Sequence, residues 1–222
     1  MKRTILLFFL IAGVTISNAQ SLRVFIGPAF STMDWKISPS VVGVDEFFEK
    51  SYTGFQAGAG IDFLKTKYFY LSSNIAYKRL GGNGQVMAVD PYGNDIGKVS
   101  TKTSLNMMYF NTSANLGIRI KERFFPYLGL GPRVEYLVSY KEKAAFLKQF
   151  EDFDELNRLM FGMLALAGIK YELDKFTLGL EFHYNHNFNK LVDQTSTAPA
   201  IVNNQIGYQY WSVFLWIGYK LK

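Results

Sequence analysis

The two histidines of this chain, His183 and His186, are the residues whose type is best suited to acid–base chemistry or metal binding. They stand three positions apart in the segment EFHYNHNF, and on a β-strand this spacing points their side chains to opposite faces. They therefore do not form a pair of metal ligands. Glu181 shares the face of His183, but the residue two positions after His183 is Asn185 and not a serine nucleophile. We expect no catalytic residue.

Other short motifs carry no stronger signal. Gly58/Gly60 and Gly129/Gly131 match parts of nucleotide-binding loops, but no helix is expected after either pair. Residues 90–95, DPYGND, lack the spacing and the closing glutamate of a calcium loop. Cysteine is absent, which excludes disulfides and thiolate metal sites. We expect no cofactor and no metal ion.

The histidines and charged residues stand on segments that alternate between apolar and polar residues, and the clearest of these runs from Tyr52 to Lys78. Its first half alternates an apolar set, Phe55, Ala57, Ala59, Ile61 and Phe63, with a small or polar set, Gly54, Gln56, Gly58, Gly60 and Asp62. The alternation resumes after a short turn at Lys65-Thr66. This pattern predicts a long β-hairpin with one apolar face.

The same alternation predicts eight strands, at residues 21–31, 52–64, 67–79, 105–120, 124–139, 159–173, 176–187 and 208–221. Tight connections alternate with long ones, which we place at residues 32–51, 80–104, 140–158 and 188–207. An even number of strands with short turns at one end and long loops at the other is typical of outer-membrane barrels. We therefore expect an all-β fold, an eight-stranded antiparallel up-and-down transmembrane β-barrel with both termini on the periplasmic side.

The apolar set is expected to face lipid. It contains no charged residue across the middle of any strand, and a lysine or arginine there costs about 2–4 kcal/mol at the bilayer midplane. Aromatic residues gather at both ends of the apolar stripe, where membrane-interface belts lie. A soluble barrel of the lipocalin type would show the opposite arrangement, with its apolar side chains inside.

Charged residues also occur in the set that faces the barrel interior. An eight-stranded barrel is only wide enough for its own side chains, so we expect these groups to pair with one another in a polar network that plugs the barrel. The alternatives are a conduction path and a catalytic carboxylate. The expected network is Arg23, Asp62, Arg119, Arg133, Glu135, Lys170, Glu172, Glu181 and His183.

The first nineteen residues are expected to be a secretory signal peptide. Lys2-Arg3 precedes an apolar run from Ile5 to Val14, and Ser17-Asn18-Ala19 offers a small-residue cleavage site. Residues 20–222 then form the barrel domain. The net charge of +6 is spread without a lysine- and arginine-rich stripe, so we expect no nucleic-acid partner.

The long connection at 140–158 differs from the others. Phe146, Leu147, Phe150, Phe153 and Leu156 recur at helical spacing between charged residues. We expect a short amphipathic helix there, which either packs on the neighbouring loops or docks a protein partner.

Several strands resemble those of the PorT-like outer-membrane β-barrel proteins, which share the eight-stranded architecture of OmpA- and OmpX-type barrels. FPYLGLGPRVEYLV is similar to the PYxxxGP strand of that family, NIAYKRLGG to its third strand, and LEFHYNHNF and FLWIGYKL to its last two. In MYFNTSANLGIRI the usual Ile-Pro is replaced by Thr112-Ser113. The resemblance implies a location in the cell outer membrane, and some family members serve the export of surface proteins.

The expected function is therefore non-enzymatic: a structural or interaction protein that displays four long extracellular loops. A more specific form of this hypothesis is that the protein is an accessory to surface-protein secretion. The protein's expected partners are outer-membrane lipid, the barrel-assembly machinery that inserts it, and a protein at loop 140–158. The alternatives are a small passive channel and a lipid-modifying enzyme that would use His183 and Glu181.

Overall fold

The alternating segments form long antiparallel strands in a computed structural model, which describes residues 19–38, 50–89, 95–142, 156–196 and 202–221. Residues 1–18 of the expected signal peptide and most of the expected helix at 140–158 lie outside the described residues; Ala19 is the first residue of β1. The strands are β1 (Ala19–Ser38), β2 (Lys50–Phe63), β3 (Phe69–Val89), β4 (Asp95–Gly117), β5 (Phe124–Glu142), β6 (Leu159–Glu172), β7 (Phe176–Asn187), β8 (Val192–Ser196) and β9 (Val202–Lys220).

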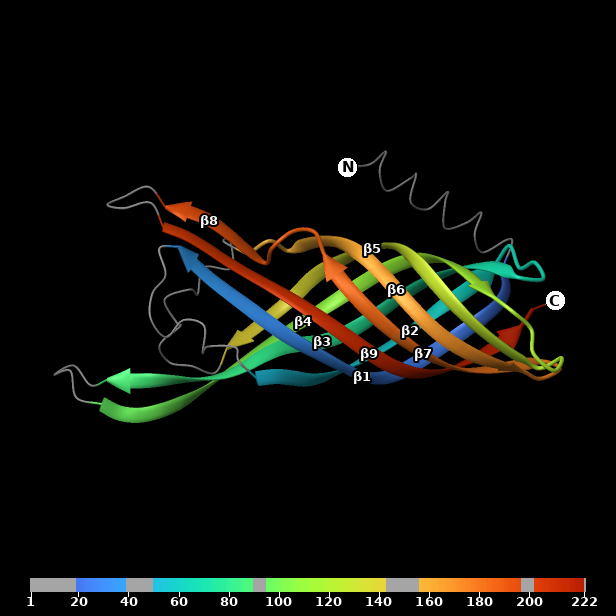
Figure 1. The fold of residues 1–222 in the computed structure, drawn as a ribbon, viewed down its shortest axis with the longest axis horizontal. Helices are drawn as coiled ribbons and strands as arrows, with labels where there is room; N and C mark the ends of the chain where they lie inside the picture. The colour runs from blue at the N-terminus through green and yellow to red at the C-terminus, as the bar shows by residue number, and fades with distance from the viewer. Residues whose placement is uncertain (1–18, 39–49, 90–94, 143–155, 197–201, 222) are drawn as a thin grey trace.

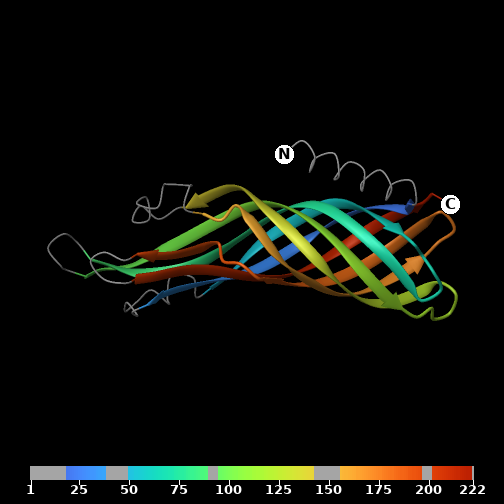
Figure 2. The same ribbon diagram turned by 90° about the horizontal axis from the view of Figure 1, so that it is seen from above.

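Eight of these strands close into a barrel. Each of β1 to β7 pairs antiparallel with its neighbour in the sequence, β7 pairs with β9, and β9 pairs with β1. The strands run obliquely around the long axis (Figures 1 and 2). This confirms the predicted eight-stranded antiparallel up-and-down barrel. The ninth strand, β8, pairs only with the far end of β9 and takes no part in the closure.

The tight connections lie at one end of the barrel. They join β2 to β3, β4 to β5 and β6 to β7, and left-handed residues at Leu64, Lys121 and Glu122 turn the chain in the first two. Ala19 and Lys220 lie at the same end, because Ala19 pairs with Phe63 and Lys220 with Ser21 (Figure 1). We call this the turn side and the opposite end the loop side.

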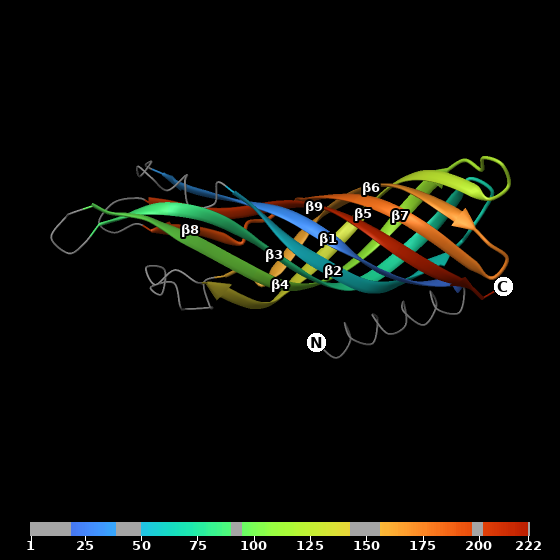
Figure 3. The ribbon, with the colours of Figure 1, turned by 90° about the horizontal axis from the view of Figure 1, so that it is seen from below.

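The strands continue much further on the loop side than the alternation predicted. The β3–β4 pairing reaches Val89 and Asp95, and the β1–β9 pairing reaches Ser38 and Asn203. Figure 3 shows the β3–β4 hairpin projecting beyond the closed barrel. The predicted long connections at 32–51, 80–104 and 188–207 are therefore partly β-structure. Their sequences do not alternate regularly, because neither face needs apolar side chains beyond the bilayer.

The outer wall is apolar over the middle of the barrel, and Phe63 differs from its expected outward place because it is buried. Aromatic pairs border this band on both sides: Phe30 stacks on Trp211 at 4.1 Å near the loop side, and Phe124 lies 4.9 Å from Tyr171 near the turns. Exposed apolar side chains between them include Leu22, Val24, Ile26, Ile75, Phe110, Leu116, Leu128, Leu130, Leu178, Leu180, Leu215 and Ile217.

The interior is not uniformly polar, which corrects the simple reading of the inward set. Large apolar and aromatic side chains share it with the charges, and Trp216 is the bulkiest of them. It fits because Gly179 faces it on β7, where a Cβ atom would lie 2.1 Å from the Trp216 ring. Among the described residues, no helix is long and apolar enough to cross a membrane.

Candidate functional site

A buried ionic cluster occupies the loop-side half of the barrel and has Glu135 on β5 at its centre. One carboxylate oxygen pairs with the Lys78 ammonium and lies 2.8 Å from Nη1 of Arg133. The Tyr210 and Tyr208 hydroxyls donate to Glu135 at 2.6 and 2.5 Å. All five side chains are buried, so the carboxylate exchanges water for four protein partners.

Aromatic rings complete the surroundings of the two cations in this loop-side cluster. The Lys78 ammonium lies 3.7 Å from the centre of the Tyr210 ring, and the Arg133 guanidinium lies 5.0 Å from it. Arg133 also donates to the Asn187 side chain, while its buried Nε has no hydrogen-bond partner within the described part of the chain. The cluster thus neutralises its cations with one carboxylate and with ring faces.

An apolar cluster covers this network on its loop side. Leu80 and Leu137 each follow a network residue by two positions, and they pack with the other members in a group that is almost completely buried. The alternation did not predict it, because Met33, Leu80 and Leu191 lie beyond the predicted strands and the inward face of the strands was expected to be polar. The members are Ala29, Met33, Leu80, Leu105, Met107, Leu137, Met160, Leu191, Tyr208 and Tyr210.

A second ionic cluster lies in the turn-side half around Arg23 on β1. Its Nη1 donates to Glu181 at 2.6 Å, and its Nε and Nη2 donate to the Asn74 side-chain oxygen at 3.0 and 2.8 Å. Asp62 lies 3.7 Å away. Glu181 also accepts the Tyr127 hydroxyl, so its charge is shared between a guanidinium and neutral donors.

Lys170 is held differently, by an aromatic cage. Its ammonium lies 3.6 Å from the centre of the Tyr70 ring, 4.7 Å from Phe125 and 5.8 Å from Tyr127. It has no ion pair within 4.0 Å among the described residues. Ring faces attract cations, so the cage holds a charge in a position that carboxylates do not reach.

The expected network extends to the turn-side rim, but Arg119 is partly exposed there and does not lie in the barrel interior as predicted. This residue lies two positions beyond the end of β4, next to the turn at 121–123, and its side chain is 43% exposed. It still contacts Glu172 at 2.8 Å, and Lys65 contacts the same carboxylate at 2.6 Å. The other eight residues of the set are buried. Among the residues that the structure describes, the buried charged side chains are four cations and four carboxylates, so their formal charges cancel.

Ser212 lies beside His183, which the sequence analysis did not predict. It stands directly opposite His183 in the β7–β9 pairing, and His183 Nε2 lies 2.7 Å from Glu181. The three residue types match those of a nucleophilic triad. However, the Ser212 hydroxyl has no hydrogen-bond partner among the described residues, and both Ser212 and His183 are buried there. A substrate therefore has no access to it.

Metal binding finds no support in the same residues. Within the part of the chain that the structure describes, no group of three His, Cys, Asp or Glu residues could hold a metal ion. His186 points outward, away from His183, as the three-residue spacing predicted. Residues 90–94 of the DPYGND segment lie outside the described residues.

Residues 8–193 match the family model of the outer membrane protein beta-barrel domain. The chain belongs to this family. It is accordingly an outer-membrane β-barrel protein, embedded in a lipid bilayer. The match is to the barrel domain in general and does not single out the PorT-like proteins. No curated protein matches the chain.

Several solved outer-membrane proteins are similar to the chain at low sequence identity. The outer membrane protein OprG from Pseudomonas aeruginosa is 14% identical with a TM-score of 0.56, and the match covers 92% of this chain and 97% of OprG. E. coli outer membrane protein W is 14% identical at a TM-score of 0.43, with 92% and 99% covered. Ail of Yersinia pestis is 14% identical at 0.42, with 90% and 98% covered.

Proposed function

We propose that this chain is a non-enzymatic outer-membrane barrel that acts through its loop side, as a structural or interaction protein. The observation that carries the proposal is the filled interior. Two neutralised ionic clusters lie one above the other, with the apolar cluster on the loop side and the Lys170 cage on the turn side. Such an interior supports the wall but offers no surface to a ligand.

The loop side, in contrast, offers a large surface to a partner. The β3–β4 hairpin leaves the aromatic border at Tyr77, and the segment from there to Val89 spans roughly 40 Å at about 3.3 Å per residue. A hairpin of this length reaches well beyond the headgroups. It supports a function in display or docking.

A role in surface-protein secretion is the finer version of this proposal, and it rests on the resemblance to PorT-like barrels. In that version the partner is a protein that docks on the loop side, at the β3–β4 hairpin or at loop 140–158. Residues 143–155 of that loop lie outside the described residues, so the hairpin carries the structural argument. The barrel-assembly machinery is the expected partner during insertion.

Crosslinked pull-down from outer membranes tests the docking proposal. One variant replaces residues 84–101 with an Asn-Gly turn, a second replaces 143–155 with a Gly/Ser linker, and a matched control changes Lys67 at the turn side to Gln. We expect a protein that is captured with wild type and with the control but is lost in at least one shortened variant. Identical partners in all four samples would contradict docking on the loop side.

Conductance measurements distinguish the passive-channel alternative from the proposed structural or interaction role. A filled interior predicts no steady conductance for the wild-type protein in planar bilayers. A large and stable conductance, with the protein still migrating as a folded barrel in unboiled gels, would favour the channel and contradict the plug.

A further inference from the structure

A group of cations lies on the outer face of β2, β3, β4 and β5, on the loop side of the aromatic border. The border crosses these strands at Tyr77 and Tyr136, which both pair with Met108 of β4. The register places the cations on the three rungs of paired residues that follow the border, where the other positions hold small or polar residues. We call this group the cationic patch, and its members are Lys50, Arg79, Lys102 and Lys141.

The charges of the cationic patch are not neutralised by the described residues. No member has a carboxylate within 4.0 Å among them; Arg79 is half-buried and the three lysines are exposed. Of the acidic residues on the same four strands, two are buried in the interior, one pairs with the buried Thr103 and one begins β4 at its far end: Asp62, Glu135, Glu142 and Asp95. The patch therefore presents four positive charges on one face.

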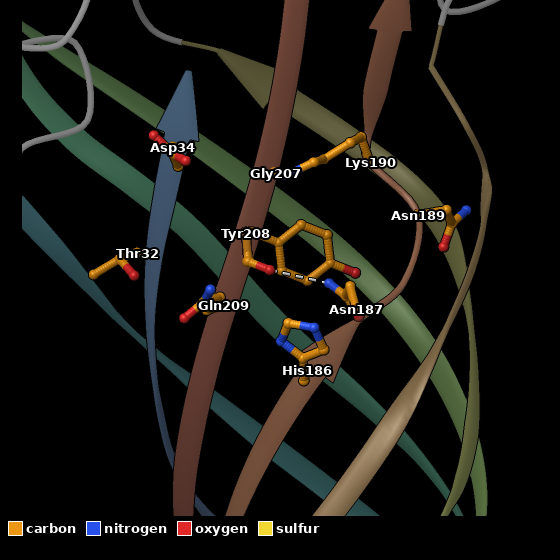
Figure 4. A pocket seen from close by; sticks show the side chains of 9 residues that line it. All are labelled: Thr32, Asp34, His186, Asn187, Asn189, Lys190, Gly207, Tyr208 and Gln209. Atoms are coloured by element: carbon orange, nitrogen blue, oxygen red, sulfur yellow. Dashed lines mark hydrogen bonds between the residues drawn. The ribbon is translucent and has the colours of Figure 1, made fainter. Parts of the chain in front are cut away.

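The wall around β1, β7 and β9 differs, because it carries charges of both signs. On β1 the Asp34 carboxylate lies 3.2 Å from the Lys36 ammonium. A pocket of about 220 Å³ at the loop-side ends of these strands is lined by Asp34, His186 and Lys190 (Figure 4). The excess of positive charge is thus a property of the β2–β5 sector of the described wall.

Hydrogen bonds connect the cationic patch to the aromatic border. The Asn106 side-chain oxygen accepts from the Tyr77 hydroxyl at 2.7 Å and from Nε of Arg79 at 3.0 Å. The Asn106 amide donates to the Ser139 hydroxyl at 2.8 Å on the next strand. Arg79 is therefore oriented through Nε, and its two terminal nitrogens are placed to form the paired contacts that phosphate oxygens accept.

The backbone beneath the cationic patch is also fixed. The Ser31 hydroxyl reaches from β1 to Gly81 on β3, where it donates to the carbonyl at 2.7 Å and accepts from the amide at 2.8 Å. The Tyr52 ring lies against Gly81, where a Cβ atom would be 3.2 Å from it, and its centre lies 5.4 Å from the Lys102 ammonium. A ligand therefore meets groups on a preformed surface, which lowers the cost of binding.

The rung on the membrane side of the border is apolar. Ile75, Phe110 and Val134 pair with one another across β3, β4 and β5, and all three are exposed on the lipid-facing wall. The same sector thus offers an apolar surface, then the aromatic border, then cations. This order matches a lipid, whose acyl chains lie in the membrane and whose charged headgroup lies at its surface.

The heights of the cations above the border indicate a large headgroup. Arg79 follows Tyr77 by one step of two residues, and Lys102 lies three such steps beyond Met108. At about 3.3 Å per residue and a strand tilt of about 40°, Arg79 lies about 5 Å and Lys102 about 15 Å beyond the border along the barrel axis. A phospholipid headgroup layer is only about 5–8 Å thick, so it reaches Arg79 but not Lys102.

We propose that the cationic patch binds the phosphate groups of a glycolipid headgroup on the loop side of the membrane. Arg79 contacts a phosphate close to the border, Lys102 contacts one further out, and the sugar hydroxyls between them meet Ser104 and Asn83. The acyl chains pack on the apolar rung. A phospholipid with one phosphate would use only Arg79, and an acidic protein segment would leave the apolar rung unused.

Native mass spectrometry of the delipidated full chain in detergent tests this site. The probes are lipid A, an acylated glucosamine disaccharide, with two phosphates, with one phosphate and with none. We expect wild type to bind the bisphosphorylated form about twentyfold more tightly than the form without phosphate, because one cation near a membrane phosphate contributes about a factor of five. The form with one phosphate should bind with intermediate affinity.

Substitutions locate the site. Arg79→Gln should weaken binding of bisphosphorylated lipid A about fivefold, and the double variant Lys102→Gln/Lys141→Gln about tenfold, while binding of the phosphate-free form should not change. Arg79→Lys should restore most of the binding. Lys36→Gln is the matched control, since it removes an exposed loop-side cation on β1, and it should bind like wild type. The double variant changes only exposed side chains, so it tests the site even if Arg79→Gln does not fold.

Four outcomes would overturn the proposal. Equal binding of the three lipids by wild type would exclude recognition of phosphate. Patch variants that all bind like Lys36→Gln would exclude this location. Inorganic pyrophosphate that displaces lipid A at the same concentration as lipid A itself would assign the patch to a free phosphate ligand. A double variant that keeps lipid binding but loses a protein in crosslinked pull-down would assign it to an acidic protein segment.

The lipid site and the docking proposal can fail independently. The variant that replaces residues 84–101 retains all four cations of the patch, so it should bind bisphosphorylated lipid A like wild type even if it loses a protein partner.

Discussion

The two halves of the barrel interior hold their charges in different ways. In the loop-side half, two cations converge on the single carboxylate of Glu135, and an apolar cluster closes the space above them. In the turn-side half, Arg23 has Glu181, Asp62 and Asn74 as partners, and Lys170 depends on aromatic rings. In the loop-side cluster both cations depend on one carboxylate, whereas in the turn-side cluster Arg23 has several partners.

The largest effect is therefore expected from Glu135→Ala. Removal of this carboxylate leaves Lys78 and Arg133 buried without an ionic partner, which should lower the free energy of unfolding by about 3–5 kcal/mol. Urea unfolding in detergent, followed by the shift between unboiled and boiled gel migration, measures it. Glu122→Ala, in an exposed turn, is the control and should change nothing. Unaltered stability of Glu135→Ala would show that the cluster does not depend on one residue.

Glu181→Ala should cost less, about 1–3 kcal/mol, because Arg23 keeps both bonds to Asn74 and keeps Asp62 nearby. The same unfolding assay compares the two variants directly. A loss larger than that of Glu135→Ala would reverse the proposed contrast between the halves. Neither variant should acquire a steady conductance in planar bilayers, since the apolar cluster is intact in both.

Lys170→Met should change stability by less than about 2 kcal/mol in either direction. The variant loses contacts between the ammonium and three rings, but it also removes a buried charge and keeps an apolar chain of similar length. Its unfolding midpoint in urea provides the measurement. A loss as large as that of Glu135→Ala would mean that the aromatic cage is as indispensable as an ion pair.

The smallest effect is expected at the rim, from Glu172→Gln. Its partners Lys65 and Arg119 are partly exposed, so loss of the two contacts should cost less than about 1 kcal/mol and the cost should shrink in high salt. Unfolding at low and at high ionic strength measures both. A cost that is independent of salt would place Glu172 functionally within the buried clusters.

Alternation predicted the wall well because lipid imposes one demand on every outward residue. The positions of Leu22, Val24 and Ile26 follow from this demand alone, and so does the inward face of Glu135. The interior imposes no such uniform demand. In YQYWSVFLWIGYK the alternation assigns Leu215 and Ile217 to the lipid face and so places Trp216 inward, but it did not predict that large aromatic side chains pack the interior beside the charges.

Features that depend on the pairing of two or more strands could not be predicted from the sequence. The opposition of Ser212 and His183 requires the β7–β9 register, which hydrophobicity does not specify residue by residue. A pocket lined by Lys190 lies where the β7–β9 pairing ends at Asn185 and Tyr210, and no residue type in the sequence predicts that end. Arg119 lies two residues past the end of β4, where the alternation and the backbone pairing continue to Ile120 but the side chain is exposed at the rim.

The long sequence separation within the ionic clusters has a consequence for how the chain folds. Arg23 and Glu181 are 158 positions apart, and Lys78 and Tyr210 are 132 apart. The Arg23–Glu181 ion pair joins β1 to β7, and the Lys78–Tyr210 contact joins β3 to β9, so a half-closed sheet would lack both contacts. Such non-local contacts make folding slow and cooperative. Insertion into vesicles should accordingly show closed barrel and unfolded chain at every time point, with no stable species between them.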